Sequence, residues 1–114
     1  MANAFLSETD TAIGTGAATI FTCPSSTETT IIGLSIANIV TSQITVDVKL
    51  NGSSRTSGAV DNVHLVKAAP IPVGGSLVVV GGDQKVVMEP GDKITVISDT
   101  ASSADCVLSH LDIT

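Results

Sequence analysis

Residues 74–98 read GGSLVVVGGDQKVVMEPGDKITVIS, and this stretch holds three short runs of mainly β-branched residues separated by two turn signals. The runs predict strands at Ser76–Val80, Gln84–Met88 and Lys93–Ser98, because β-branched side chains favour extended backbone. The GGD segment at 81–83 supplies residues that tolerate positive φ in a tight connection. We therefore expect the three strands to form a meander.

The second connection, EPGD at residues 89–92, has the residue order of a type II turn. Pro90 occupies the second turn position, where its fixed φ fits, and Gly91 occupies the third, where the turn needs a positive φ. In the strand that follows, Ile94 and Val96 share one face while polar residues point the other way. This alternation is typical of a strand with one buried face.

Comparable runs occur elsewhere in the chain, and they predict strands at Ala17–Cys23, Thr29–Asn38, Gln43–Leu50, Val63–Ala69 and Asp105–Thr114. In the second of these, Ile32, Leu34 and Ile36 are expected to share a face, and Gly33 to mark a bulge or a close backbone approach. In the last one, Val107, Ser109, Leu111 and Ile113 are expected to share a face. About eight strands without an amphipathic helix predict an all-β, antiparallel β-sandwich of jelly-roll or immunoglobulin-like type.

A chain of 114 residues has room for a single domain. We assign residues 16–114 to the sandwich and residues 1–15 to an N-terminal arm, in which Phe5 and Leu6 precede a polar, acidic run. The sequence leaves open whether this arm docks on a neighbour or packs on its own domain. The small, polar segment 53–62 is interpreted as a long loop.

Charged residues make up 14% of the chain, against about a quarter in typical proteins. Eleven acidic and five basic residues give a net charge of −6, and the bases are scattered, so nucleic acid is not an expected partner. With only two aromatic residues, platforms for stacking sugars or bases are scarce. Neither a signal peptide nor a membrane-length apolar run is visible, so we expect synthesis in a cytoplasm and no membrane partner.

The residues that could carry chemistry are few. His64 and His110 lie among apolar neighbours, where a hydrogen-bonded structural or interface histidine is the usual role, and Cys23 and Cys106 are interpreted as buried free thiols, with a disulfide as the alternative. These four residues match no metal-ligand spacing. Acids in or beside loops are interpreted as turn formers and solvated charges, with a calcium loop as a weaker alternative: Asp61, Asp83, Asp92, Asp99 and Asp105. The sequence therefore predicts a protein without enzymatic activity or cofactor.

Several strands are apolar on both faces, including 30–36, 77–80 and 86–88, whereas a sandwich buries only one face of each sheet. The apolar side chains therefore exceed what the core of one sandwich can bury. We expect part of this apolar surface to be covered by other copies of the chain, as a dimer or trimer, or by another protein. The interface residues that this predicts are Phe5, Leu6, Leu77, Val79 and Val87.

The order of segments from about Thr30 onward resembles the small virion structural proteins of tailed bacteriophages, particularly those of marine and cyanobacterial hosts. The resemblance is carried by LVKAAPIP at 65–72, followed by Gly-Gly, an apolar strand, EPGD, ITVISDTAS at 94–102 and a final VLSHLDIT. The resemblance implies a structural component of the virion, and it assigns no catalytic residues to this chain.

Two placements in the virion compete. The chain either decorates the capsid by clamping subunits of the major capsid protein, or belongs to the neck, tail or a fibre attachment. A third hypothesis is a host-surface binding module that uses loops 53–62 and 99–104, although the scarcity of aromatic residues disfavours glycan.

Overall fold

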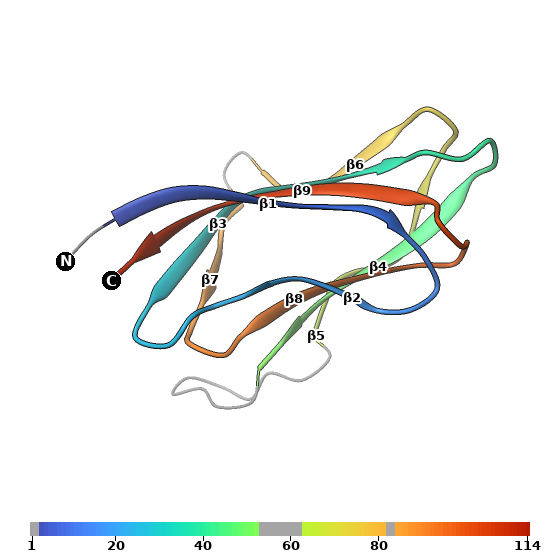
Figure 1. Ribbon diagram of the computed structural model, residues 1–114. Coiled ribbons are helices and arrows are strands. Elements are labelled where there is room, and N and C mark those ends of the chain that lie inside the picture. The colour runs from blue at the N-terminus through green and yellow to red at the C-terminus, as the bar shows by residue number, and fades with distance from the viewer. Residues whose placement is uncertain (1–2, 53–62, 82–83) are drawn as a thin grey trace.

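The computed structural model describes residues 3–52, 63–81 and 84–114, and these residues form strands without a helix. The strands are β1 (Asn3–Ile13), β2 (Ala18–Thr22), β3 (Glu28–Asn38), β4 (Ile44–Asn51), β5 (Val63–Ile71), β6 (Ser76–Val80), β7 (Val86–Met88), β8 (Lys93–Ser98) and β9 (Ala104–Ile113). They lie in two layers, as Figure 1 shows. The prediction of an all-β, antiparallel protein is confirmed, and the layers are consistent with a β-sandwich.

Sheet A has the strand order β1-β9-β3-β6, and β7 also pairs with β3. Sheet B has the order β2-β8-β4-β5. Early strands thus pair with late ones: β1 with β9, β2 with β8, β3 with β6 and β7, and β4 with β5, all antiparallel. The chain therefore behaves as one long antiparallel ribbon that folds over on itself.

The core lies between the inner faces of the sheets, where apolar residues follow the two-residue period of each strand. In β4, as expected, Ile44, Val46, Val48 and Leu50 are buried and the residues between them are half-buried. In β8, Ile94 and Val96 are fully buried, which confirms the predicted face. Burial of these side chains supplies the main driving force for joining the sheets, at about 25 cal/mol per Å² of apolar surface.

The predicted meander is wrong. β6 and β7 both pair with β3, and β8 lies in the other sheet between β2 and β4. The local pattern identified the strands but not their partners, because pairing depends on hydrogen bonds between segments that are distant in the sequence. The predicted turn at residues 81–83 cannot be compared in full, because residues 82–83 lie outside the described residues.

The EPGD segment forms the predicted turn. Gly91 has a φ of 89°, and the Asp92 N–H donates to the Glu89 carbonyl at 3.0 Å. This turn joins β7 to β8 and so carries the chain from sheet A to sheet B (Figure 1). The Asp92 side chain is fully buried and accepts the Glu89 N–H at 3.0 Å, so the expectation that this carboxylate is solvated is wrong.

The pairing of β3 with β9 shifts register between Ile31 and Gly33, which confirms the predicted irregularity at Gly33. The extra residue moves the buried face by one position, so that Ile31 is fully buried and Ile32 is only half-buried. The expectation that Ile32 shares the buried face with Leu34 and Ile36 is therefore wrong.

The first described segment of the expected N-terminal arm is a strand. β1 pairs with β9 from Asn3 to Ile13, and it forms the edge of sheet A. Residues 3–13 thus pack on their own domain, which was one of the two alternatives, and they add a ninth strand. The loop expected at 53–62 lies outside the described residues.

Candidate functional site

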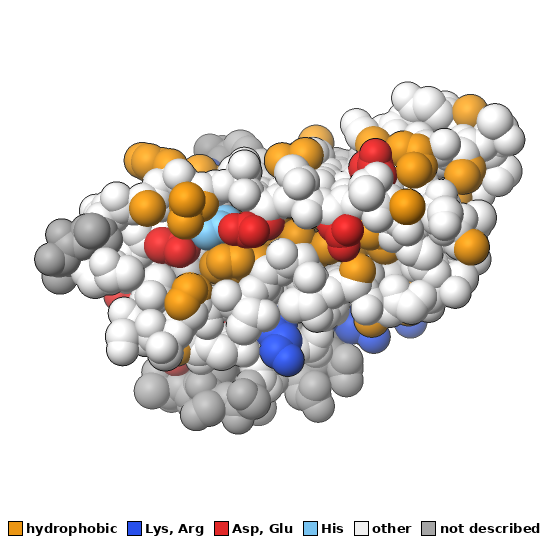
Figure 2. All heavy atoms as spheres, in the orientation of Figure 1, with side chains coloured by type: hydrophobic (Ala, Val, Ile, Leu, Met, Phe, Trp, Pro, Cys, Tyr) orange, Lys and Arg blue, Asp and Glu red, His pale blue; other side chains and the backbone are white. Residues whose placement is uncertain are grey.

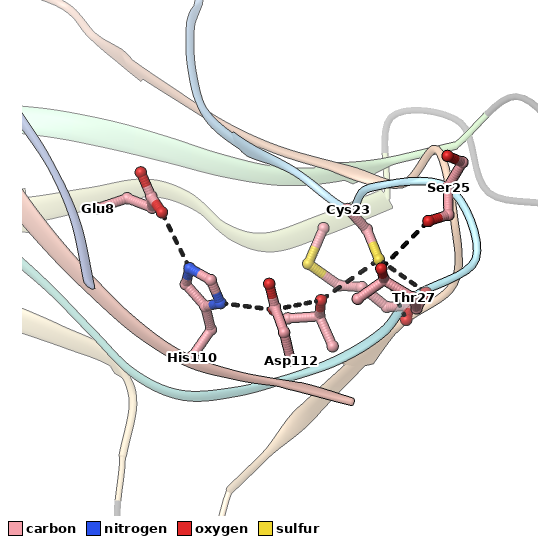
Figure 3. A network of polar contacts seen from close by, with 8 residues as sticks. Glu8, Cys23, Ser25, Thr27, His110 and Asp112 are labelled. Carbon is pink, nitrogen blue, oxygen red and sulfur yellow. Dashed lines mark hydrogen bonds and ion pairs between the residues drawn. The ribbon is translucent and has the colours of Figure 1, made fainter. Parts of the chain in front are cut away.

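A chain of polar contacts runs along the inner face of sheet A (Figure 3). At its centre His110 of β9 is fully buried, with Nε2 at 3.0 Å from Glu8 Oε2 of β1 and Nδ1 at 2.8 Å from Asp112 Oδ1. The ring also stacks on Phe21 of β2, with ring centroids 4.1 Å apart. One histidine thus contacts both sheets and the edge strand.

The contacts continue from Asp112 to the end of β2. The Thr29 hydroxyl donates to Asp112 Oδ1 at 2.8 Å, and the Thr29 Oγ1 lies 3.3 Å from Cys23 Sγ. The thiol also reaches the Thr27 carbonyl at 3.3 Å. We call Glu8, Cys23, Thr29, His110 and Asp112 the buried polar network.

The hydrogen-bonding capacity of the imidazole defines what the network can do. A neutral ring donates from one nitrogen only, whereas carboxylates accept. Both ring nitrogens of His110 face a carboxylate oxygen, so both contacts are hydrogen bonds when the ring carries two protons. Through these contacts His110 of β9 is linked to Glu8 of β1, so the prediction that this histidine is hydrogen-bonded is confirmed.

The network resembles a set of catalytic residues in composition but not in geometry. His110 is held by two carboxylates, and Thr29 and Asp112 lie between it and Cys23. Burial raises the pKa of the Cys23 thiol above 9.0, the opposite of what an activated nucleophile requires. The arrangement therefore favours a structural role for these residues.

Both cysteines are buried free thiols, as predicted. Burial raises the pKa of Cys106 to about 11. The alternative of a disulfide between Cys23 and Cys106 is contradicted.

The other residues singled out in the sequence are spread over the molecule. His64 is exposed on β5, opposite Lys49. Asp99 accepts the Thr45 N–H, and Asp105 accepts the Thr11 hydroxyl at 2.7 Å; these hydrogen bonds lower the pKa of each carboxyl. Both acids are the turn and loop formers that the sequence predicted, whereas Asp61 and Asp83 lie outside the described residues.

Within the described residues, no group of three or more His, Cys, Asp or Glu side chains is arranged to hold a metal ion. The same residues include no helix long and apolar enough to cross a membrane.

The outer face of sheet A carries a row of residues that crosses four strands. Phe5 of β1 is opposite Leu111 of β9, which is opposite Thr30 of β3, which is opposite Val87 of β7. Directly opposed residues in antiparallel strands point to the same side. Phe5 and Val87, at the two ends of the row, are 76% and 60% exposed.

A second row lies parallel to the first. Thr9, Val107, Ser35 and Val78 are opposed in turn across β1, β9, β3 and β6. Val78 is 66% exposed and Val107 is 46% exposed. Between the rows lie three small residues, Ser7, Ser109 and Gly33. These three sets contain no charged side chain, and we call them together the uncharged face.

Sheet B has a different outer face. Its outward residues include Asp47, Lys49, Lys93, Thr95 and Ile97, so charges of both signs alternate with polar groups. Figure 2 views the two sheets edge-on: hydrophobic side chains are scattered over this side of the molecule, and the basic side chains lie in its lower part, toward sheet B.

The structure places the five predicted interface residues in different environments. Phe5 and Val87 lie on the uncharged face, whereas Leu6 is opposite His110 on the inner side of the edge strand and is half exposed. Leu77 and Val79 are partly buried against the core. Sequence reasoning missed Val78, between them, and also Val107. The alternation in β6 could have shown that Val78 points opposite to its neighbours, but the buried side could not be assigned without the partner strand.

Comparisons of this chain with protein-family models, curated proteins and solved structures found no match.

Proposed function

We propose that this chain is a non-enzymatic structural protein of a bacteriophage virion, made in the host cytoplasm, which decorates the capsid by associating with itself and binding the major capsid protein. The observation that carries this proposal is the uncharged face, a sheet surface on which the apolar residues Phe5, Val78, Val87 and Val107 are exposed. Exposed apolar surfaces of this kind are typical of protein contact sites.

The strand order supports a jelly-roll type for the sandwich in preference to an immunoglobulin-like one. Pairing of β1 with β9, β2 with β8 and β4 with β5 is what a folded antiparallel ribbon produces. Jelly rolls recur in viral capsid domains. Because a fold alone does not determine function, this support is an analogy.

The chemistry of the interior also favours a structural role. His110 is held between two carboxylates, and burial raises the pKa of the Cys23 and Cys106 thiols. Free thiols agree with folding in a reducing cytoplasm.

The test is to mix the purified chain with empty shells of the major capsid protein from the same source and to image them by electron microscopy, with untreated shells as the control. Added density repeated over the shell lattice is the expected result. Density only at a tail or portal vertex would replace decoration with the neck and tail placement. Shells without added density at saturating concentrations of the chain would contradict the proposed function.

A further inference from the structure

The buried imidazole of His110 is a titratable group that the proposed structural role does not use. The ring contacts Glu8 Oε2 of the edge strand β1 at 3.0 Å and Asp112 Oδ1 of its own strand at 2.8 Å (Figure 3). Histidine is the side chain whose ordinary change of charge falls between about pH 5 and 8. The number of protons on this ring therefore decides how many of its two contacts are hydrogen bonds.

The two carboxylates that face the ring are held differently. The Asp112 side chain is 12% exposed, and its Oδ1 also accepts the Thr29 hydroxyl at 2.8 Å, so β3 helps to fix it. The Glu8 side chain is 39% exposed and lies on the edge of sheet A, beside water. A ring with one proton donates to one carboxylate and turns a lone pair toward the other. Glu8 can exchange the ring for water more easily than Asp112 can, so deprotonation breaks the contact to β1.

The other groups around the ring do not replace its proton. The further titratable groups on the inner side or buried beside it are Asp10 of β1, Cys106 of β9, Cys23 after β2 and Asp92 of the turn between β7 and β8. The neighbouring strands turn uncharged residues inward, including Phe21, Ile31, Met88 and Ile94. The lysines of the described residues are exposed or lie on the outer face of sheet B, so none of them competes with the ring for Glu8.

We propose that His110 is a pH-dependent link between the edge strand β1 and the rest of sheet A: the doubly protonated ring holds Glu8, and loss of one proton releases Glu8 and loosens β1 on β9. β1 is suited to this behaviour because, of residues Asn3–Ile13, only Ile13 is buried. The attachment is strongest in mildly acidic solution and weakens as the pH rises through the range of histidine. Below about pH 4 the carboxylates take up protons, and the link is lost from that side too.

The link operates in the isolated chain and does not depend on the proposed role in a virion. Its test is amide hydrogen exchange in β1 at about pH 5.5 and about pH 8, on either side of the histidine range, with each rate divided by that of an unstructured peptide at the same pH. Protection of the β1 amides is expected to fall about three- to tenfold between the two values, the effect of one lost hydrogen bond. NMR titration should show the His110 and Glu8 resonances shifting together, with the exposed His64 of β5 as the reference.

Glu8→Gln separates a pH-dependent link from a merely structural contact. The amide of Gln accepts from a protonated ring nitrogen and donates to an unprotonated one, so this variant should remove the pH dependence of β1 protection. Loss of a structural contact would instead lower protection equally at both pH values. Asp10→Asn is the matched control, because it makes the same change of charge at the next position on the same side of β1, and it should keep the pH dependence.

Circular dichroism verifies that each variant is folded, and Glu8→Ala, which also has no carboxylate for the ring, replaces Glu8→Gln if that variant does not fold. Equal protection of wild-type β1 at the two pH values would overturn the inference. A pH dependence that Glu8→Gln retains would do the same, and so would one that Asp10→Asn loses, since the net charge rather than the ring would then be responsible. A His110 ring that keeps one protonation state throughout the range would also overturn it.

Discussion

Sheet A and sheet B distribute polarity in opposite ways. Sheet B has an inner face of apolar residues such as Val48, Ile94 and Val96 and a charged outer face. Sheet A buries a histidine and an aspartate on its inner face and exposes apolar residues on its outer face. The charged outer face of sheet B is well solvated by water. In sheet A, the buried polar side chains of the inner face need hydrogen-bond partners, and the apolar side chains of the outer face are exposed to water. The difference is the reason that the proposed contacts with other chains are placed on sheet A.

The largest effect is expected where sheet A differs most from sheet B, at its buried polar network. Asp112→Ala removes the acceptor for both His110 Nδ1 and the Thr29 hydroxyl. Each buried group left without its hydrogen-bond partner costs about 1–3 kcal/mol, so we expect a loss of about 2–6 kcal/mol in urea unfolding. Asp99→Ala, at an exposed carboxylate of the other sheet's loop, is the control and should cost far less. Equal losses in the two variants would remove the distinction between the sheets.

The turn that connects the two sheets should give the next largest effect. Gly91→Ala forces a side chain onto a residue with a φ of 89°, and a strained conformation of this kind costs about 1–2 kcal/mol. Gly16→Ala is the control, because a Cβ there would meet nothing within 4 Å. Thermal unfolding of both variants measures the difference. If Gly91→Ala is as stable as the control, the turn does not depend on positive φ.

A matched pair in β8 tests the two faces of sheet B. Ile94→Val removes a methylene from a fully buried side chain and should cost about 1 kcal/mol. Ile97→Val makes the same change on the charged outer face, where Ile97 is half-buried, and should cost less. Urea unfolding of the two variants compares them directly. The opposite order would mean that the outer face of sheet B is also covered.

The smallest effect on stability at neutral pH is expected from the buried thiols, which change the free energy of unfolding only at alkaline pH. Burial raises the pKa of Cys106 from 9.0 to about 11, so between these values the unfolded chain releases a proton that the folded chain keeps. Stability is therefore fully present below pH 9 and falls as the pH rises toward 11, by at most about 1.4 kcal/mol per pH unit for one proton. Unfolding free energies measured across this range should fall less steeply in Cys106→Ala than in the wild type. Parallel pH profiles would show that Cys106 is not the group responsible.

Local chemistry was sufficient to predict several features from sequence. Ser76–Val80 and Lys93–Ser98 are strands with the predicted bounds, and the turn at Gly91 has the predicted positive φ. These features depend on the conformational preferences of a few adjacent residues. The buried polar network could not be predicted in this way, since Glu8 and His110 are 102 positions apart and meet only because β1 pairs with β9.

The amino-acid sequence by itself determined where this chain is extended, where it turns, and that apolar residues outnumber the positions of a two-layer core. Only the tertiary structure decided which strands pair, and which side is outside in strands such as β3 and β6 that are apolar on both faces. Because the side-chain period of a strand is two, a bulge such as the one at Gly33 exchanges the buried and exposed sets, and Val78 rather than Leu77 faces outward. Which strand lies beside which depends on hydrogen bonds between distant segments, and no local pattern records them.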